Sequence, residues 1–433
     1  MSLLAAAFLI STQSDLAFLR DLAHSVVDAS LVKIGAQIPG GPINTTGRGL
    51  HVPGGTQNFY PAFWIRDAAM MLGSDLVPAA EVEGWIRLVA SVQPGPAGID
   101  FAHGLHVPGF SVPDHIALDG AACWYPGAYA DQGVGNYGYL PPADDAFYFI
   151  QMIQEHARLA PGSHLFTQPM KTPWGEHLLS EVAAKAFYSV ETDPKTGLVI
   201  CDSAPQRTRV DWGFCDSISK TGSCLMPSLL RWQASQRLAD LCRSNGQAAE
   251  SMAYRKAAKQ IQSSLETTFF QPLSASEGFL MSATGIGRKD DVWASAFAVW
   301  LGVLPRSTEK AVCRHLLNLY RGKTIIDGGQ IRHLPKDGPF GGYWDRTSCG
   351  RDAYQNGGYW ATPTGWLVTA LQKVDPKAAQ ELLSQYVGFV RGRRGAGAPY
   401  EWINSSTNTF SNANYGSSAG LVYISLMQSG FRS

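Results

Sequence analysis

Short and long linkers alternate along this chain, and the alternation constrains its fold more than any other feature. Apolar residues recur with helical period from end to end and predict twelve helices. Linkers after even-numbered helices are tight, as at Val77-Pro78 and Val374-Asp375, with 161–172 the longer exception. Linkers after odd-numbered helices run to about 20–50 residues, well beyond the usual 2–8 between helices. The predicted helices span 14–33, 61–76, 79–93, 142–160, 173–190, 221–243, 247–269, 291–302, 307–320, 358–373, 376–391 and 415–429.

This pattern predicts an all-α protein in which six helical hairpins close into an (α/α)6 toroid. Six helices form an inner ring, six form an outer ring, and the long loops gather on one face, where they can build a cleft. Small β-hairpins can decorate these loops, but no separate β domain is expected. No Ser/Pro-rich stretch, charge run or low-complexity tract marks a domain boundary, so residues 1–433 are expected to form one catalytic domain.

Charge and composition restrict the partners of this chain. Lys and Arg number 35, as do Asp and Glu, and this balance argues against nucleic acid, which needs a basic surface. No apolar run is long enough to predict a membrane-spanning helix. The seven cysteines show no CxxC spacing, which disfavours a zinc knuckle, and their odd number weighs against a disulfide framework. The compartment stays open, because a removed signal peptide would leave no trace.

Aromatic residues are concentrated in the long loops. Such rings suit stacking on an uncharged, partly apolar ligand such as a sugar; the alternative is that they fill the core of the loop cluster. The loop aromatics are Phe59, Tyr60, Trp64, Trp124, Tyr125, Tyr137, Tyr139, Trp212, Tyr343, Trp344 and Trp402.

The first two long loops carry polar groups of different kinds. Arg66 and Asp67 follow an aromatic run at the start of the second helix, where they can bind sugar hydroxyls on the cleft floor or form a pair stabilised by the helix dipole. In the second loop, His103, His106 and His115 lie among carboxylates that include Asp114 and Asp131. A metal site is disfavoured because no HExxH-type spacing is present, so neither a metal nor another cofactor is expected.

Three carboxylates are candidates for acid–base chemistry. Asp211 and Asp216 flank Trp212 in the third loop, and packing against Trp is a known way to raise the pKa of a carboxyl group and make it a general acid. Asp216 can instead be a turn or cap residue. Glu401 lies between Tyr400 and Trp402 as the one acid of the sixth loop, which makes it a candidate base or an exposed loop residue.

The remaining polar loop residues divide between a helix cap and a substrate wall. Asp291, which precedes a helix, is interpreted as its N-cap. The fifth loop interleaves polar and aromatic residues without helical period, as expected for a wall that contacts substrate. Its candidate binding residues are Arg332, His333, Trp344, Asp345, Gln355 and Asn356.

Three segments resemble known glycosidase-related toroids. The stretch 59–67, followed by Ala68-Ala69-Met70, resembles the Tyr-x-Trp-x-Arg-Asp start of the second helix in glucoamylases. The stretch 354–358 resembles the Tyr-Gln-Asn-Gly-Gly segment of cellobiose-phosphorylase-like toroids, and 291–305 resembles a helix of bacterial rhamnosidase-like toroids. The resemblance implies the six-hairpin glycosidase superfamily over nearly the whole chain, without selecting one family.

Carried over by position, the resemblance assigns roles to specific residues. Glucoamylase-like enzymes keep their acid between helices five and six and their base between helices eleven and twelve. Those loops here hold Asp211 or Asp216 and Glu401, while Arg66 and Asp67 match the pair that binds the terminal sugar. The Glu-Glu pair of glucoamylases is missing; trehalase-like and invertase-like toroids use an Asp, to which Cys215-Asp216-Ser217 is nearer, so the choice of acid stays open.

The leading interpretation is a glycoside hydrolase that acts on carbohydrate by inversion, with Trp64, Trp212 and Trp402 among its substrate contacts. The acid protonates the leaving oxygen while the base activates water on the opposite ring face. Trp212 is expected to make the acid the less solvated of the two carboxyl groups. One alternative is a glycoside phosphorylase, which would need a basic pocket for which Arg332, His333 and Arg346 are candidates. The other is a toroid that binds sugar without catalysis.

Overall fold

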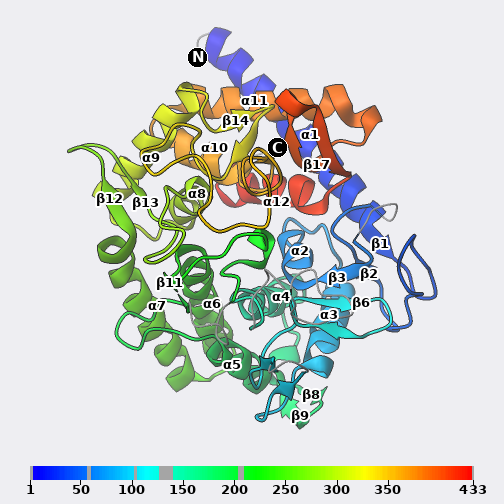
Figure 1. Ribbon diagram of the computed structural model, residues 1–433. Coiled ribbons are helices and arrows are strands. Elements are labelled where there is room, and N and C mark those ends of the chain that lie inside the picture. Colours follow the sequence, from blue (N-terminus) through cyan, green and yellow to red (C-terminus); the bar gives the residue numbers. More distant parts are fainter. Residues whose placement is uncertain (1–2, 56–59, 102–104, 126–139, 203–208, 432–433) are drawn as a thin grey trace.

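Twelve α-helices dominate the computed structural model, which describes residues 3–55, 60–101, 105–125, 140–202 and 209–431. Contacts between helices show a closed inner ring, because α2 packs on α4, α4 on α6, α6 on α8, α8 on α10, α10 on α12, and α12 again on α2. The odd-numbered helices pack on the outside of this ring (Figure 1). The helices are α1 (Leu3–Ser30), α2 (Ile65–Met70), α3 (Ala79–Val92), α4 (Asp145–Leu159), α5 (Leu179–Ser189), α6 (Leu225–Ser244), α7 (Ala248–Phe269), α8 (Val292–Leu301), α9 (Arg306–Arg321), α10 (Thr364–Gln372), α11 (Pro376–Arg393) and α12 (Gly416–Gln428).

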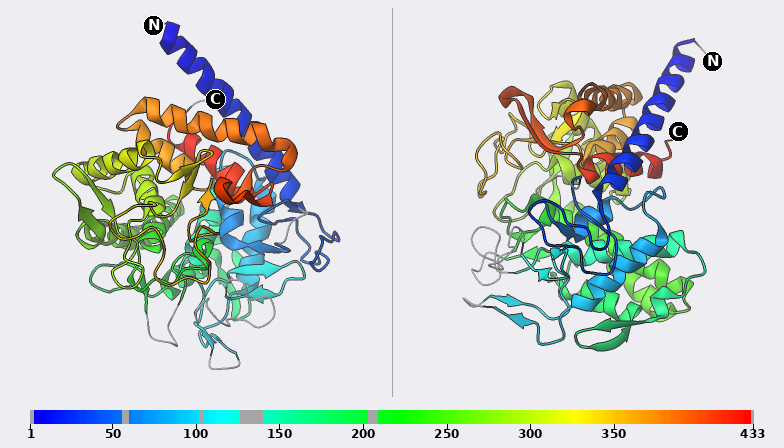
Figure 2. Two further views of the ribbon diagram at one scale, coloured as in Figure 1. Left: turned by 45° about the horizontal axis from the view of Figure 1, so that its top comes forward. Right: turned by 90° about the vertical axis from the view of Figure 1, so that its right-hand side faces the viewer.

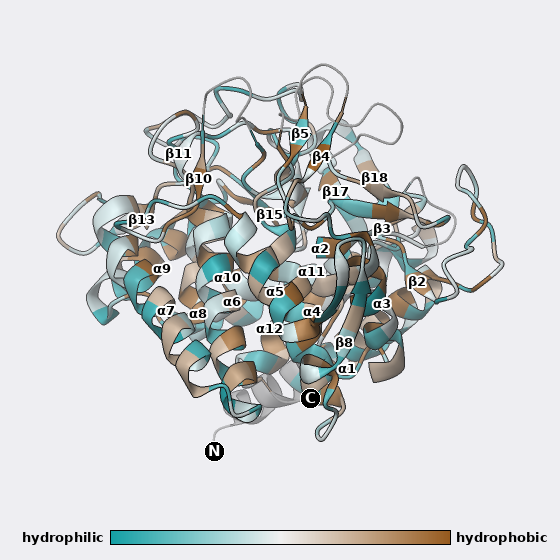
Figure 3. Ribbon diagram, turned by 90° about the horizontal axis from the view of Figure 1, so that it is seen from below, coloured by the Kyte–Doolittle hydropathy of each residue, from teal (hydrophilic) through white to brown (hydrophobic). Residues whose placement is uncertain are grey.

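The predicted (α/α)6 toroid is therefore confirmed. Figure 3 shows most strands and long loops on one face and the tight linkers on the other. Local chemistry sets several helix ends. The Asp291 side chain accepts a hydrogen bond from the Ala294 N–H at 2.8 Å, which confirms it as the N-cap of α8, and Gly302 ends that helix with φ of 65°.

Strands shorten three of the predicted helices. Residues 62–64 form β3 (Ala62–Trp64), so α2 starts at Ile65 instead of 61. The pair β8 (Pro169–Thr172) and β9 (Gly175–Leu178) delays α5. Similarly, β16 (Tyr359–Trp360) delays α10, because it pairs with strands on both sides. Helical period in the sequence could not reveal these pairings, since they depend on loops distant in the chain. Conversely, α1 starts at Leu3, well before the predicted residue 14, and its first turns project from the molecule (Figure 2).

The long loops carry more β structure than the hairpins expected. Loops five and six together build a five-stranded antiparallel sheet in the order β14-β15-β16-β17-β18, which joins the wall of one loop to the wall of the other. A second sheet has the order β3-β6-β7. The remaining described strands pair as β1 with β2, β4 with β5, β8 with β9, β10 with β11 and β12 with β13. The strands not yet given bounds are β1 (Leu31–Val32), β2 (Leu50–His51), β4 (Ile99–Asp100), β5 (His106–Val107), β6 (His115–Ala117), β7 (Ala122–Cys123), β10 (Ile200–Cys201), β11 (Gly222–Ser223), β12 (Phe270–Pro272), β13 (Gly278–Leu280), β14 (Ile326–Asp327), β15 (Gln330–Arg332), β17 (Tyr400–Asn404) and β18 (Thr409–Ala413).

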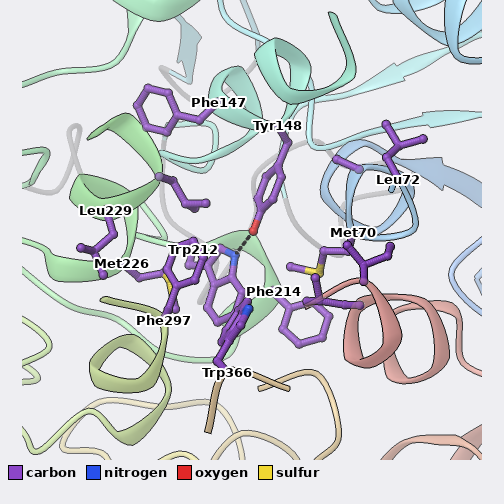
Figure 4. Close-up of a cluster of buried hydrophobic side chains, with 14 of the residues drawn as sticks. Met70, Leu72, Phe147, Tyr148, Trp212, Phe214, Met226, Leu229, Phe297 and Trp366 are labelled. Atoms are coloured by element: carbon purple, nitrogen blue, oxygen red, sulfur yellow. Dashed lines mark hydrogen bonds between the residues drawn. The ribbon is translucent and has the colours of Figure 1, made fainter. Parts of the chain in front are cut away.

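Aromatic and aliphatic side chains fill the barrel formed by the inner helices. The indole of Trp212 lies near those of Trp293 and Trp366, with ring centroids 6.2 and 6.5 Å away. Its N–H donates to the Tyr148 hydroxyl at 3.0 Å (Figure 4). This packing supports the loop face from below. No helix among the described residues is both long enough and apolar enough to cross a membrane, and all seven cysteines are free.

Candidate active site

A pocket on the loop face brings together residues from loops that are far apart in sequence. It encloses about 290 Å³ of empty space. Five of its walls are aromatic, and its charged groups are one arginine and three carboxylates, a mixture suited to a sugar ring with its hydroxyls. The described lining residues are Pro53, Tyr60, Trp64, Arg66, Asp67, Gly213, Phe214, Asp216, Tyr354, Glu401 and Tyr415.

Glu401 is held rigidly on one wall by β17. The Tyr60 hydroxyl donates to both carboxylate oxygens, at 3.0 and 3.2 Å, and the Asn412 amide N–H donates to Oε2. Burial, which leaves Glu401 2% exposed, raises its pKa to about 8, although both donors favour the ionised form and oppose that rise. The site therefore presents a desolvated carboxyl group with fixed orientation.

Asp216 lies at the end of a short 3-10 helix, Gly213–Cys215, between α5 and α6. The Gln355 side-chain N–H donates to its Oδ1 at 3.2 Å. Burial raises the pKa of Asp216 to about 6, and nearby Arg66 counteracts part of that rise. Asp216 and Glu401 thus line the same pocket from the two loops that sequence reasoning selected.

The expected difference in solvation between these carboxyl groups is wrong. Asp216 is half-buried, whereas Glu401 is almost completely buried, so the candidate acid is the more solvated of the two. Trp212 points into the barrel core, where it bonds to Tyr148, and it does not line the pocket. Its sequence position beside Asp216 was misleading, because the 3-10 turn directs the two side chains to different places.

The structure also separates the two candidate acids. Asp211 is fully buried, and its Oδ2 pairs with Lys220 Nζ at 3.0 Å. Lys220 also lies 3.9 Å from Asp291, and its ammonium group sits 4.8 Å from the Trp344 ring centroid. Asp211 is therefore part of a buried ionic network outside the pocket lining, while Asp216 lines the pocket.

Arg66 and Asp67 form part of the pocket wall at the start of α2. The Arg66 guanidinium bonds to Asp114 at 2.5 Å and lies 3.4 Å from Asp145. The Tyr415 hydroxyl donates to Asp67 Oδ1 at 2.9 Å. Burial raises the pKa of Asp67 to about 6 despite the neighbouring Arg66. A buried, oriented pair of this kind can bind sugar hydroxyls as both donor and acceptor.

A further carboxylate supports the acid loop from below. Asp144 is completely buried and accepts a hydrogen bond from the Gly213 N–H at 2.9 Å. Burial raises its pKa to about 7. The backbone next to Asp216 is thereby tied to the first turn of the inner helix α4.

Most residues predicted to form the substrate wall of loop five instead hold the loops together. Gln355 accepts from the backbone N–H and hydroxyl of Ser217 at 2.9 and 2.6 Å and donates to the Phe214 carbonyl at 2.5 Å. Asn356 accepts from the Trp344 backbone N–H at 3.0 Å. Both amides lie outside the pocket lining, and Gln355 reaches the site through Asp216.

Four other predicted contacts are also committed elsewhere. Arg332 donates to the Leu334 carbonyl at 2.8 Å, and Asp345 pairs with Lys289 at 2.7 Å. The prediction that these residues contact substrate is not supported by the described lining of the pocket. The same holds for buried His333, which bonds to Asp291 at 3.0 Å, for buried Trp344, and for Trp402, whose ring centroid is 6.3 Å from that of Tyr354.

The histidines of loop two are engaged in pairs. His106 lies 2.7 Å from Asp100 on an exposed hairpin, and buried His115 lies 2.7 Å from Asp114 and stacks on Trp64. Within the described ranges no group of three or more His, Cys, Asp or Glu side chains could hold a metal. Phe59, His103, Asp131, Tyr137 and Tyr139 lie outside the described residues.

Sequence reasoning missed several pocket residues. Tyr60 and Tyr354 lie within the two motifs quoted above, so their positions were available, but their roles were not. Tyr415 directly precedes the last inner helix, as Trp64 precedes α2, and a search for aromatics at loop-to-helix junctions could have found it. Asn412 gives no such signal, because it reaches Glu401 through the register of β17 and β18.

Comparison with known proteins decides the family. The family model described as amylo-alpha-1,6-glucosidase matches residues 130–396, well over half of the chain. The chain belongs to this family. Its members' description names a glycosidase, and the chain is accordingly a glycoside hydrolase of the six-hairpin superfamily. No curated protein is similar enough in sequence to count as a match.

Solved structures share the fold of this family member. A GH63 mannosylglycerate hydrolase from Thermus thermophilus, in complex with glucose, aligns over 94% of this chain and 99% of its own, with 13% identity and a TM-score of 0.56. The glucoamylase of Hormoconis resinae aligns over 97% of this chain and 74% of its own, with 14% identity and the same TM-score of 0.56. The glucoamylase of Saccharomycopsis fibuligera aligns over 96% and 95%, with 13% identity and a TM-score of 0.53. At these identities the likeness concerns the toroid itself.

Proposed function

We propose that the loop-face pocket hydrolyses a glycosidic bond with inversion, using Asp216 as general acid and Glu401 as general base. The observation that carries this proposal is that both carboxyl groups line one pocket, each from the loop expected for its role. In this mechanism the Asp216 carboxyl donates its proton to the leaving oxygen. The Glu401 carboxylate takes a proton from water as that water attacks the anomeric carbon from the opposite face.

The polar environment of each carboxyl group supports these roles. Tyr60 and Asn412 both donate to Glu401, which favours the ionised form that a base needs. Asp216 keeps a raised pKa, so it retains a proton closer to neutral pH than an exposed Asp would. Arg66 and Asp67 would hold the hydroxyls of the sugar whose bond is cleaved, so that the ring is positioned for attack.

The family description makes α-glucosides, and α-1,6-linked ones first, the substrates to test. A phosphorylase is not favoured, because Arg66 is the one basic residue among the described lining residues and three carboxylates surround it. A pocket of this charge would repel phosphate. Hydrolysis in phosphate-free buffer, with the first product inverted in anomeric configuration by NMR, is the expected result.

Replacing the base provides the decisive test. Glu401→Gln should lower kcat by about 10²–10⁴-fold while leaving substrate binding largely intact, because it removes a proton acceptor without changing shape. Asp216→Asn should act similarly, and its loss should be smaller for substrates with good leaving groups, which need less protonation. Glu381→Gln, an exposed change on α11, serves as the matched control. Near-normal turnover by the Glu401 variant would refute the assignment.

A further inference from the structure

A second cavity penetrates the barrel from all six inner helices. It encloses about 420 Å³ of empty space, more than the 290 Å³ of the loop-face pocket. The two cavities share no described lining residue. The second is lined by Met70, Leu72, Tyr148, Gln151, Leu230, Gln233, Arg237, Phe297, Trp300, Trp366, Leu421, Ile424 and Gln428.

Its walls are divided between an apolar interior and a polar rim. The aliphatic lining residues and Phe297 are buried, whereas the three glutamines and Arg237 are half-buried or exposed. In Figure 4, Met70, Leu72, Tyr148, Phe297 and Trp366 gather inside the ring of inner helices. A ligand that fits this division has an apolar body and one polar end.

Arg237 supplies a cation that no carboxylate compensates. Among the described residues it forms no ion pair, and its hydrogen-bond partner is the Gln151 side-chain oxygen at 3.0 Å. Gln151 is oriented by its own bond to the Ala69 carbonyl at 2.8 Å, so its acceptor faces Arg237. The nearest acid, Glu155, is already paired with Arg158 at 2.8 Å. Burial lowers the pKa of Arg237 to about 10, consistent with a guanidinium that lacks a counter-charge.

The second polar feature of the wall is also a donor without an acceptor. Trp366 is 3% exposed, and its indole N–H has no hydrogen-bond partner. A buried, unpaired donor of this kind costs stability unless a ligand satisfies it. Tyr148 accepts from Trp212, which leaves its own O–H free to donate. The cavity therefore offers a cation and further donors, and no lining residue is acidic.

We propose that this cavity binds an amphipathic monocarboxylate, with the carboxylate paired to Arg237 at the rim and the aliphatic or aromatic body between the inner helices. A carboxylate supplies the acceptors that the cavity lacks, and its bond to a guanidinium is charge-assisted. The apolar body covers the Met, Leu, Ile and Phe side chains of the interior. This site is distinct from the proposed catalytic pocket and does not depend on the function of that pocket.

Octanoate is a suitable probe, with octan-1-ol as a partner of nearly the same body but without the charge. Binding is measured by isothermal titration calorimetry at pH 7 and by quenching or shift of tryptophan fluorescence, since Trp300 and Trp366 lie in the wall. We expect saturable binding of octanoate, and weaker binding of octan-1-ol by about tenfold or more. Equal affinity for acid and alcohol would overturn the proposal, as would no saturable octanoate binding.

Two variants separate the role of Arg237 from a general effect of charge. Arg237→Gln should weaken octanoate binding by about tenfold or more and leave octan-1-ol binding nearly unchanged. Arg243→Gln, on the same helix but exposed and paired with Asp240, should change neither. Melting temperatures confirm that each variant is folded. If Arg237→Gln disrupts folding, Leu421→Phe in the cavity wall should abolish binding of both probes; unchanged octanoate binding by the available cavity variant would contradict the assignment.

Discussion

At the scale of single residues, the pocket assigns different hydrogen-bond partners to its two carboxyl groups, and this makes them separable by pH. With pKa values of about 8 for Glu401 and about 6 for Asp216, kcat/KM should follow a bell-shaped profile with its maximum near neutrality. The active form needs Glu401 ionised and Asp216 protonated. Because the base has the higher pKa, this form is a minority species whose population is constant between the two values and falls outside them.

Tyr60→Phe tests the upper limb of that profile. The Tyr60 bond lowers the pKa of Glu401, so its removal should raise that pKa and move the alkaline limb to higher pH. If the pKa of Glu401 rises by about one, maximal kcat/KM should fall by about tenfold, because less of the enzyme carries the ionised base. Gln355→Leu removes the donor that lowers the pKa of Asp216 and should instead move the acidic limb upward. If Tyr60→Phe moved the acidic limb alone, the roles given to the two carboxyl groups would have to be exchanged.

At the scale of elements, much of the architecture could be read from linker lengths. Helices with long uninterrupted period, such as 248–269 and 376–393, matched prediction within two residues because their faces are set by local spacing. The three shortened helices did not, because strand pairing between distant loops overrode helical period. The same limit applies to the site. Arg66, Asp67, Asp216 and Glu401 were chosen by position relative to helices, whereas the clamping role of Gln355 depends on a fold of the loops that spacing does not encode.

The junction between the acid loop and α2 illustrates this dependence on close contact. A Cβ placed on Gly213 would lie 2.7 Å from Arg66 Cζ, and Arg66 cannot easily withdraw because Asp114 binds it. Gly213→Ala should therefore lower the free energy of unfolding by about 1–3 kcal/mol and reduce turnover, since it displaces the loop that carries Asp216. Chemical denaturation and steady-state kinetics measure the two effects.

Gly388→Ala is the matched control for that change. Gly388 lies within α11, and a Cβ there would meet no atom within 4 Å. The change should leave activity intact and stabilise the helix by up to about 1 kcal/mol, because Gly is a poor helix former. Equal stability of the Gly213 and Gly388 variants would show that the loop accommodates the added methyl group.

At the scale of the whole molecule, buried carboxyl groups around Arg66 couple stability to pH. Burial raises the pKa of Asp144 from its ordinary value near 4 to about 7, so the folded protein retains a proton that the unfolded chain loses. This contribution to stability is complete at low pH and is lost as pH rises through about 7. Asp67 and Asp216, each with a raised pKa, act in the same direction.

Asp144→Asn should therefore become more stable relative to the original protein as pH rises from 5 to 8. Asn cannot ionise, and the difference in unfolding free energy should grow by about 2 kcal/mol over this range. Melting temperatures at constant ionic strength provide the measurement, with exposed Asp240→Asn as control. A difference between the Asp144 variant and the original protein that stays constant with pH would mean that Asp144 does not hold its proton in the folded state.

Closure of the ring leads to a last expectation, that residues 1–433 unfold as one domain. The inner ring is completed by α12, which packs on α10 and α2, and α1 covers α12 from outside. The segment 130–396 matched by the family model lacks α1–α3 and α12, so its remaining inner helices α4, α6, α8 and α10 would expose apolar faces. We expect one calorimetric transition for the full chain and no cooperative melting for the segment alone. Two separate transitions, or a segment 130–396 with sharp melting and near-ultraviolet circular dichroism, would instead indicate that part of the ring is an autonomous folding unit.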